Sequence, residues 1–418
     1  MTAISSRHTL GEQMQACTGC AACAAACPQR CISMQPDAEG FVQPQIDALR
    51  CNGCNVCRRI CPAMRPPAVS VAGETSKDSL RPFPQVFAAW HLDETVRRES
   101  SSGGVFTALA EYVLGLGGVV VGAAFDAQLV VRHVMIERSD DLHRLRGAKY
   151  VQSDLSPDLI RHMQGQLKQG GSVLFSGTPC QVAGVRSALD EGTGRLLCCD
   201  VACHGVPSPR LLERYIEHHA QMGGPLRSLS FRAKAPGWKT YSVRRESQDG
   251  DARTTPMRDD PYMAAFLRDY ALRPACYACK FASTTRTSDL TIADFWGVAN
   301  RYPEYDRDDK GTSLVLANNA RGLDWLTACR ASLFVGEADI ETAIAGNPVL
   351  IRACGRPPER DTFYGDVKTL SFEELVRRYR LCGPPLTRRV LSRIKASLSA
   401  IARRCGAGGA AVRPVGKW

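Results

Sequence analysis

The sequence predicts an α/β protein, α+β overall, in which a small cysteine-bound domain precedes a larger domain of alternating strands and helices. Two cysteine runs, the second ending at Cys61, indicate the small domain. The larger domain is predicted by the strand-like runs VFAAW, VVVGAAF, LVVRHVMI, SVLFSG and LLCCDVA, which alternate with helical stretches at 104–116, 157–168 and 209–222. We expect the small domain over residues 1–65, a proline-rich linker over 66–82, the larger domain over 83–380 and a tail over 381–418.

Nineteen cysteines in 418 residues are unusual for an ordinary cytosolic enzyme. Disulfide scaffolds are normally short secreted chains, and the amino terminus carries no apolar run of a signal peptide, so metal binding is the better interpretation. The most apolar stretch, Val113–Phe125, is too short for a membrane-spanning helix and contains four glycines. We therefore expect a cytoplasmic protein. Its formal charge of +11 favours phosphorylated cofactors or acidic partners without choosing between them.

The two cysteine runs, CTGCAACAAACP at 17–28 and CNGCNVCRRICP at 51–62, repeat the C-x2-C-x2-C-x3-C-P pattern of a loop that winds around a 4Fe-4S cluster. In that pattern three thiolates bind one cluster and the fourth crosses to the other. One predicted cluster is therefore bound by Cys17, Cys20, Cys23 and Cys61. The other is bound by Cys51, Cys54, Cys57 and Cys27.

Zinc is the alternative metal for these runs, but zinc spacings lack the repeated third and fourth cysteines. Cys31 falls outside the pattern and is expected to pack without binding metal, and residues 41–47 are expected to form a strand. This part of the chain resembles a bacterial two-cluster ferredoxin domain. Such a domain has no substrate of its own, so we expect it to conduct electrons into the rest of the chain.

The larger domain contains a possible anion site in ESSSGGVFTAL, where Ser101, Ser102, Gly103 and Gly104 precede a predicted helix. Free amides at a helix start suit a dinucleotide pyrophosphate. The alternative is that the serines only cap the helix.

Four further cysteines, far apart in sequence, could bind a third 4Fe-4S cluster. Cys180 and Cys203 each follow a strand-like run, so both should lie beyond the carboxyl ends of strands, where open sheets bind ligands. Cys276 and Cys279 form a C-x2-C pair. The alternative for each is ordinary burial, which we expect for Cys198 and Cys199 inside their strand.

Catalytic residues are less well marked, and the candidates are His204 and Asp294. Asp289 and Asp294 flank a short strand in SDLTIADFWG, and Asp294 could orient a cofactor or relay a proton, or else bond its own backbone in a turn. His204, beside Cys203, could move protons or simply pack.

From SSSGGVFTAL through RGAKYVQSDL, FSGTPCQVAG, CHGVPSP, FRAKAPGW and SDLTIADFWG to NPVLIR, residues 83 to about 365 resemble the beta subunits of the coenzyme F420 (deazaflavin) hydrogenase and dehydrogenase family. The resemblance implies FAD near Ser102, Gly103, Gly104, Lys149 and Tyr150, and supports the third cluster. Ala148 and Ala293 replace a serine and a glycine of the family pattern, which changes little. Because relatives include reductases of chlorophyll-type pigments, fold and cofactor transfer better than substrate.

We therefore expect an iron-sulfur flavoprotein oxidoreductase that passes electrons between 4Fe-4S clusters, FAD and a deazaflavin-type or other reducible substrate. The alternatives are a relay subunit without its own substrate, and a reductase of a pigment or other non-deazaflavin substrate. The expected partners are an electron donor or acceptor protein and a small molecule, not nucleic acid. LTRRVLSRIKASLSAIARRC at 386–405 is basic and amphipathic, so it could contact the inner face of the membrane; the alternative is a helix packed on its own domain.

Overall fold

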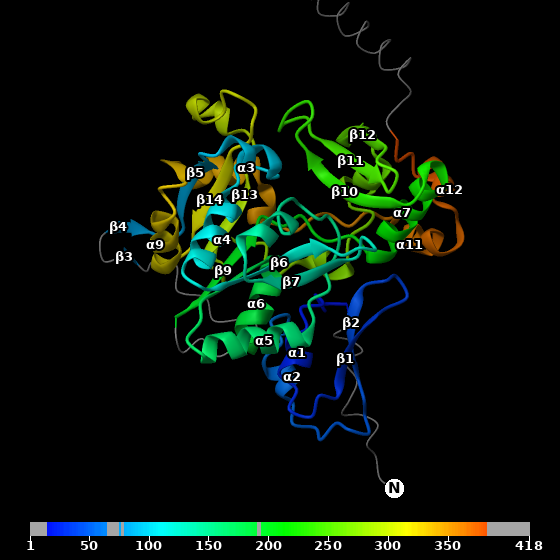
Figure 1. The fold of residues 1–418 in the computed structure, drawn as a ribbon. Coiled ribbons are helices and arrows are strands. Elements are labelled where there is room, and N and C mark those ends of the chain that lie inside the picture. Colours follow the sequence, from blue (N-terminus) through cyan, green and yellow to red (C-terminus); the bar gives the residue numbers. More distant parts are fainter. Residues whose placement is uncertain (1–14, 65–74, 77–78, 190–193, 383–418) are drawn as a thin grey trace, which may run out of the picture.

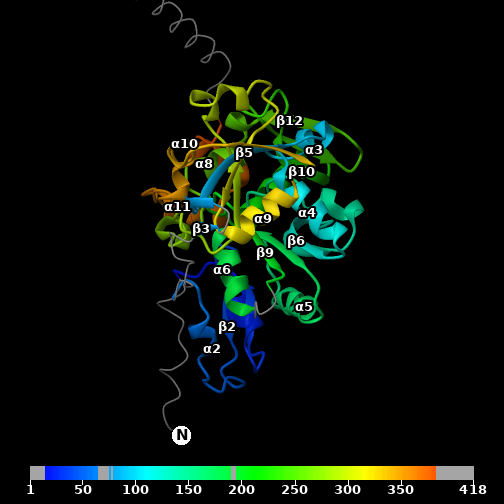
Figure 2. The ribbon, with the colours of Figure 1, turned by 90° about the vertical axis from the view of Figure 1, so that its left-hand side faces the viewer.

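The computed structural model describes residues 15–64, 75–76, 79–189 and 194–382 (Figure 1). The basic amphipathic segment at 386–405 and most of the expected linker lie outside these residues. No helix within the described ranges has both the length and the apolar character needed to cross a membrane. Figures 1 and 2 show a small amino-terminal domain at one end of the molecule, next to α5 (Pro157–Lys168) and α6 (Pro179–Ala188) of a much larger body.

The small domain repeats one loop geometry in its two cysteine runs. Each run contains a one-turn helix, α1 (Ala22–Ala25) or α2 (Val56–Arg59). The residue before each helix is left-handed, with φ of 58° at Ala21 and 57° at Asn55. Between the runs, β1 (Ile32–Pro36) pairs antiparallel with β2 (Val42–Ile46), which confirms the strand expected over residues 41–47. The repeated backbone is what two loops winding around similar groups require.

The larger body is built on a mixed eight-stranded sheet, as the α/β prediction requires. In spatial order its strands are β15 (Leu333–Glu337), β5 (Gln85–His91), β14 (Ser313–Ala317), β13 (Leu290–Asp294), β9 (Leu196–Val201), β8 (Val173–Gly177), β6 (Val119–Phe125) and β7 (Val131–Ile136). The four central strands β13, β9, β8 and β6 run parallel, and the outer strands pair antiparallel. All five strand-like runs of the sequence are strands of this sheet.

Helices cover both faces of the sheet because successive strand residues point to opposite sides. In β6, Val120 packs with α4 (Val105–Gly115) and α9 (Ala320–Ala328) on one face. Val119 and Val121 pack with α5 and α6 on the other face. Cys199 and Cys198 divide between the two faces in the same way, so both are core residues as expected.

A second layer packs beside the sheet, and the sequence analysis predicted only its helix over 209–222. It consists of a three-stranded antiparallel sheet and four helices around a shared aromatic core. The strands are β10 (Leu226–Ala233), β11 (Ser242–Ser247) and β12 (Ala252–Pro256), and the helices are α7 (Pro209–Gly223), α8 (Pro261–Leu267), α11 (Arg360–Thr369) and α12 (Phe372–Arg378). Apart from short 3-10 helices, the remaining elements are β3 (Thr75–Ser76), β4 (Ser79–Pro82), α3 (Glu94–Glu99) and α10 (Ile340–Gly346).

Candidate functional site

A cavity of about 1370 Å³ opens at one edge of the large sheet. Because β6, β8, β9 and β13 are parallel neighbours, their carboxyl ends meet at this edge, where open α/β sheets bind ligands. The segments that follow β8 and β9 line the cavity, as do Asp294 at the end of β13 and the start of α4. The volume exceeds that of a typical small-ligand pocket, so the cavity has room for more than one group.

Four cysteines from three distant segments line this cavity, and we call them the cavity set: Cys180, Cys203, Cys276 and Cys279. Cys180 lies in the first turn of α6 and Cys203 follows β9, whereas Cys276 lies in a 3-10 turn at Pro274–Ala278. Burial, together with the thiols of Cys276, Cys180 and Cys279, raises the pKa of Cys203 well above its ordinary range. Burying several thiols together is costly for thiolates unless a cation stabilises them, so the arrangement fits a metal cluster.

The eight cysteines of the small domain gather into the two groups that the sequence predicts. Burial raises the pKa of Cys20 to about 12, and its neighbouring thiols Cys17, Cys180 and Cys61 contribute. Cys23 in turn neighbours Cys17, Cys20 and Cys61, and we call these four cysteines the inner set. Burial and the neighbours Cys54, Cys27 and Cys51 likewise raise the pKa of Cys57, and these four cysteines form the outer set. Cys31 lies beside the outer set, with its Sγ 3.5 Å from that of Cys27.

The inner set lies against the cavity set because α6 packs directly on the first cysteine loop. A Cβ at Gly184 of α6 would come within 2.7 Å of the Cys20 Sγ, so only glycine allows this approach. Arg273 holds the same loop by donating from Nε to the carbonyl of Cys17 at 2.6 Å and from Nη2 to that of Val42 at 3.1 Å. The β1–β2 turn of the small domain is held through Glu39, whose carboxylate accepts two hydrogen bonds from Arg360.

The predicted anion site is at the amino terminus of α4, which faces the cavity. Ser102 and Gly104 line it, and Gly104 adopts a left-handed φ of 93° before the helix begins. Gly103 packs behind them, since a Cβ there would lie 2.3 Å from the carbonyl oxygen of Ala89. Gly103 therefore permits close packing of the loop on β5 and is not among the described residues that line the cavity.

Lys149 and Tyr150 also line the cavity, but each already has partners. The ammonium of Lys149 donates to the carbonyls of Arg144, Leu145 and Arg146 at 3.1, 3.1 and 2.7 Å, so it caps a turn of the chain. Burial lowers the pKa of Lys149 to about 7. Tyr150 stacks on Phe266 with ring centroids 4.9 Å apart, which leaves its ring as an aromatic wall.

Asp294 is joined to the start of α4 by an arginine that the sequence did not single out. Arg232, buried in β10, donates from Nη2 to Asp294 at 2.8 Å and to the carbonyl of Ser101 at 3.0 Å. Trp238 also donates to the Asp294 carboxylate, at 2.5 Å. Asp294 is therefore held by side chains from another layer, not by its own backbone turn. Asp289 at the other end of the strand is a buried ion-pair partner of Arg186 and Arg321.

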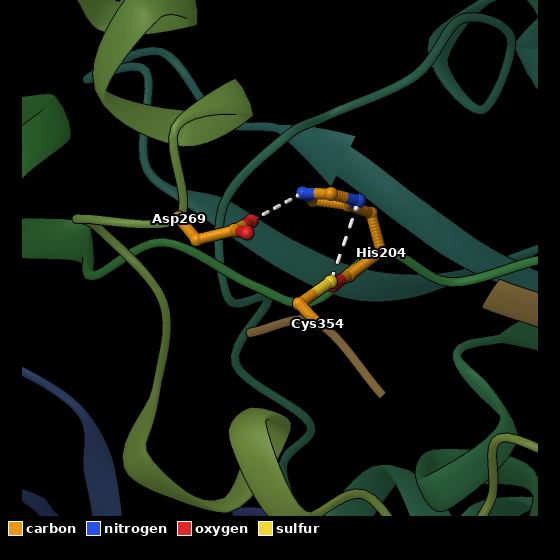
Figure 3. A group of neighbouring side chains, drawn as sticks. All are labelled: His204, Asp269 and Cys354. Atoms are coloured by element: carbon orange, nitrogen blue, oxygen red, sulfur yellow. Dashed lines mark hydrogen bonds and ion pairs between the residues drawn. The ribbon is translucent and has the colours of Figure 1, made fainter. Parts of the chain in front are cut away.

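His204 lies between an acid and a thiol at the cavity wall (Figure 3). Its Nε2 is 2.7 Å from Asp269 Oδ1, and its Nδ1 is 3.4 Å from the Sγ of Cys354. Cys354 also donates to the carbonyl of His204 at 2.7 Å. Neither Cys354 nor Asp269 belongs to a spaced motif, so no pattern in the sequence marks them. Only folding brings both to the residue that follows Cys203.

Three buried arginines around the cavity have guanidinium nitrogens without a hydrogen-bond partner among the described residues. They are Nε of Arg232, Nη1 of Arg273, and Nε and Nη2 of Arg286. An unpaired buried donor is costly, so these groups suit a ligand that carries anionic or carbonyl oxygens. With the free helix start and the aromatic wall, they fit a flavin dinucleotide, which has both phosphates and an aromatic ring system.

Comparisons with known proteins match the small domain and the larger body separately. Residues 16–64 match a 4Fe-4S dicluster domain. Residues 86–159 and 170–342 match the amino- and carboxyl-terminal parts of the coenzyme F420 hydrogenase/dehydrogenase beta subunit. One component of the F(420)H(2) dehydrogenase of Methanosarcina mazei is 22% identical over 286 residues, which span 65% of this chain and 73% of that protein.

Among solved structures, the F420-reducing nickel-iron hydrogenase complex from Methanosarcina barkeri contains a similar chain. The match has a TM-score of 0.44 at 18% identity and covers 71% of this chain and 91% of that one. The two beta-subunit matches together span more than half of the sequence and begin after the dicluster domain ends. The chain is thus an iron-sulfur electron-transfer protein that belongs to the family of coenzyme F420 hydrogenase/dehydrogenase beta subunits.

Proposed function

We propose that this protein is an FAD-dependent oxidoreductase with three 4Fe-4S clusters, which exchanges electrons with a deazaflavin-type or other reducible organic substrate in the cavity. The observation that carries the proposal is the series formed by the three cysteine sets. Cys57 of the outer set neighbours Cys23 of the inner set, and Cys20 neighbours Cys180 of the cavity set. The series leads from the surface to the cavity.

Bound clusters would handle single electrons and FAD would handle pairs, so together they would link a one-electron carrier to hydride chemistry. The chain's own residues would position these groups. Arg273 would hold the inner set in place through the carbonyl of Cys17. The start of α4, with Arg232 beside it, would bind the cofactor's phosphates.

His204 and Asp294 stay the candidates for proton handling. The Asp269 carboxylate fixes the ring of His204, which leaves Nδ1 directed toward Cys354 at the cavity wall. Asp294 is ion-paired with Arg232 and lines the same cavity, so its carboxylate would orient a bound group there.

Iron and sulfide content tests the cluster assignment. We expect about twelve of each per chain after anaerobic reconstitution, and about eight in the variant Cys279→Ser, with the small-domain signals retained. Cys329→Ser is the matched control, because Cys329 is a buried thiol that packs near Ala108 of α4, remote from the three sets. Eight iron atoms in the unaltered protein would remove the third cluster from the proposal.

Flavin content tests the second cofactor. Ser102→Asp places a negative charge beside the start of α4, where it should repel the phosphates while leaving the helix intact, since acids at a helix start do not destabilise it. Ser102→Ala is the control at the same position, because it removes the hydrogen bond to Thr312 without adding charge. We expect about one FAD per chain in the control and little in Ser102→Asp. Equal flavin in both would place the phosphates elsewhere.

A relay subunit without its own substrate is the second candidate, and the cavity argues against it. About 1370 Å³ bordered by the cavity set is more than a cluster alone needs. Turnover separates the two. Reduction of a deazaflavin or a small quinone by the fully loaded protein supports the oxidoreductase. Loaded clusters and flavin without turnover of either acceptor favour the relay.

A further inference from the structure

The outer set lies at the end of the small domain that points away from the large sheet, as both ribbon views show for the chain between β2 and α2 (Figures 1 and 2). Cys54 is exposed, and so are its neighbours from Asn52 to Asn55. Nearby, Leu49 is 99% exposed, which makes it the most open large hydrophobic side chain of the described protein. The exposed thiol of Cys54 therefore leaves the outer set open to a partner at this end of the small domain.

Three arginines surround this tip, and two of them are bonded to the cysteine loops. Arg59 donates from Nη1 to the carbonyl of Cys54 at 2.9 Å, and Arg50 donates from Nη2 to the carbonyl of Gln29 at 3.1 Å. Arg58 is exposed in the last turn of α2. We call Leu49, Arg50, Cys54, Arg58 and Arg59 the outer face. Two of its three guanidinium groups, those of Arg50 and Arg59, are thus held beside the cysteine loops.

Little negative charge from the chain itself offsets these arginines. Asp47 is the one acid in residues 40–64, and its carboxylate accepts a hydrogen bond from the amide of Leu49 at 3.0 Å. The other acids of the described small domain, Asp37 and Glu39, lie in the β1–β2 turn at its docked end. Glu39 pairs there with Arg360, and Asp37 accepts a hydrogen bond from Gln43. The outer face is therefore positive, with three arginines and no acid, whereas the rest of the described small domain carries Arg30 against Asp37, Glu39 and Asp47.

We propose that the outer face is the docking surface for a small acidic one-electron carrier protein, a proposal that rests on the function proposed above. Docking would bring the carrier's redox centre to Cys54 and oxidise the carrier by one electron as the outer centre gains it. Electron-transfer contacts are small, and arginine with an apolar centre is typical of interfaces. Opposite charge raises the rate of encounter more than it raises affinity, which suits a partner that must leave after each electron.

The test is anaerobic stopped-flow reduction of the fully loaded chain by a reduced acidic plant-type ferredoxin. In the double variant Arg50→Glu with Arg58→Glu, the second-order rate at low ionic strength should fall by about 10- to 100-fold. The difference in rate between the variant and the parent should shrink to within about 3-fold at 0.5 M salt, because charges more than about 4 Å apart are then largely screened from one another. Arg59 is left unchanged because it bonds Cys54 itself, a member of the outer set, whereas Arg50 bonds Gln29, which is not a member.

The matched control is Arg138→Glu with Arg253→Glu, which makes the same charge change at arginines that are 75% and 60% exposed on the larger body. We expect its rate to stay within about 2-fold of the unaltered protein. Reduced methyl viologen, a small cation that needs no docking surface, should reduce both double variants at least as fast as the parent.

The outcomes separate this inference from the function on which it rests. Equal rates with ferredoxin in both double variants, alongside normal iron and normal reduction by viologen, would overturn the docking surface and leave the oxidoreductase intact. A chain that takes up no iron would overturn both. A salt-sensitive loss confined to the outer-face variant would establish the docking surface.

Discussion

The contact between Gly184 and Cys20 gives the sharpest quantitative test of how the small domain meets the larger one. A Cβ at position 184 would lie 2.7 Å from both the Cβ and the Sγ of Cys20, closer than real side chains approach. In Gly184→Ala, α6 and the first cysteine loop must therefore separate. Overpacking of this kind costs about 1–3 kcal/mol. Replacing glycine by alanine inside a helix gains about 1 kcal/mol in return.

Gly165→Ala isolates the helix term, because Gly165 lies in the neighbouring helix α5 and an added Cβ there meets nothing within 4 Å. We expect this control to gain about 1 kcal/mol and Gly184→Ala to be less stable than the control by about 1–3 kcal/mol. Urea unfolding of both variants, loaded with iron under anaerobic conditions, measures the difference. If Gly184→Ala gains as much as Gly165→Ala, α6 does not lie against Cys20 and the series of cysteine sets is broken there.

Three further predictions concern His133, Glu39 and the carboxyl-terminal segment. Burial lowers the pKa of His133 to about 4, so the unfolded chain binds a proton at this residue first and the protein loses stability as the pH falls from about 6.5 toward 4. Between pH 7.5 and 5.5, His133→Asn should therefore lose about 1 kcal/mol less of its unfolding free energy than the parent protein does. His143→Asn, at an exposed position, should lose as much as the parent. Glu39→Gln should lower the unfolding free energy measured in urea by about 3 kcal/mol, because the buried Arg360, 2% exposed, loses its bidentate partner. Asp361→Asn alters a 70% exposed carboxylate paired with the same arginine and should lower it by about 0.5 kcal/mol or less. Deleting residues 384–418 should abolish sedimentation with anionic liposomes and leave the iron and flavin content unchanged, since each basic residue near such a surface contributes about 1 kcal/mol to binding. If the intact protein stays in the supernatant at low salt, the tail is instead packed on its own domain.

The metal chemistry of the small domain was fixed by the sequence itself. The four cysteines of each run lie within twelve residues, at 17–28 and 51–62, so the spacing alone predicts that each loop can wind around a cluster. The strands before Cys180 and Cys203 were predictable for a similar reason, because continuous apolar runs in a chain of alternating elements indicate buried parallel strands.

Tertiary structure alone decided how these pieces meet. Arg232 comes from β10, a strand that the sequence did not predict, and it reaches both Ser101 and Asp294. Cys354 lies far along the chain from His204, and no local pattern connects the two.

Lys149 shows that a residue identified from the sequence can have a different local role in the fold. The family pattern associates this lysine with a cofactor, but its ammonium donates to three carbonyls of its own chain. Spacing within a loop is set by covalent geometry and can be inferred from a sequence. Which side chains face one another across a cavity depends on how whole layers pack, and that packing is a sum of many weak contacts with no signature at any single residue.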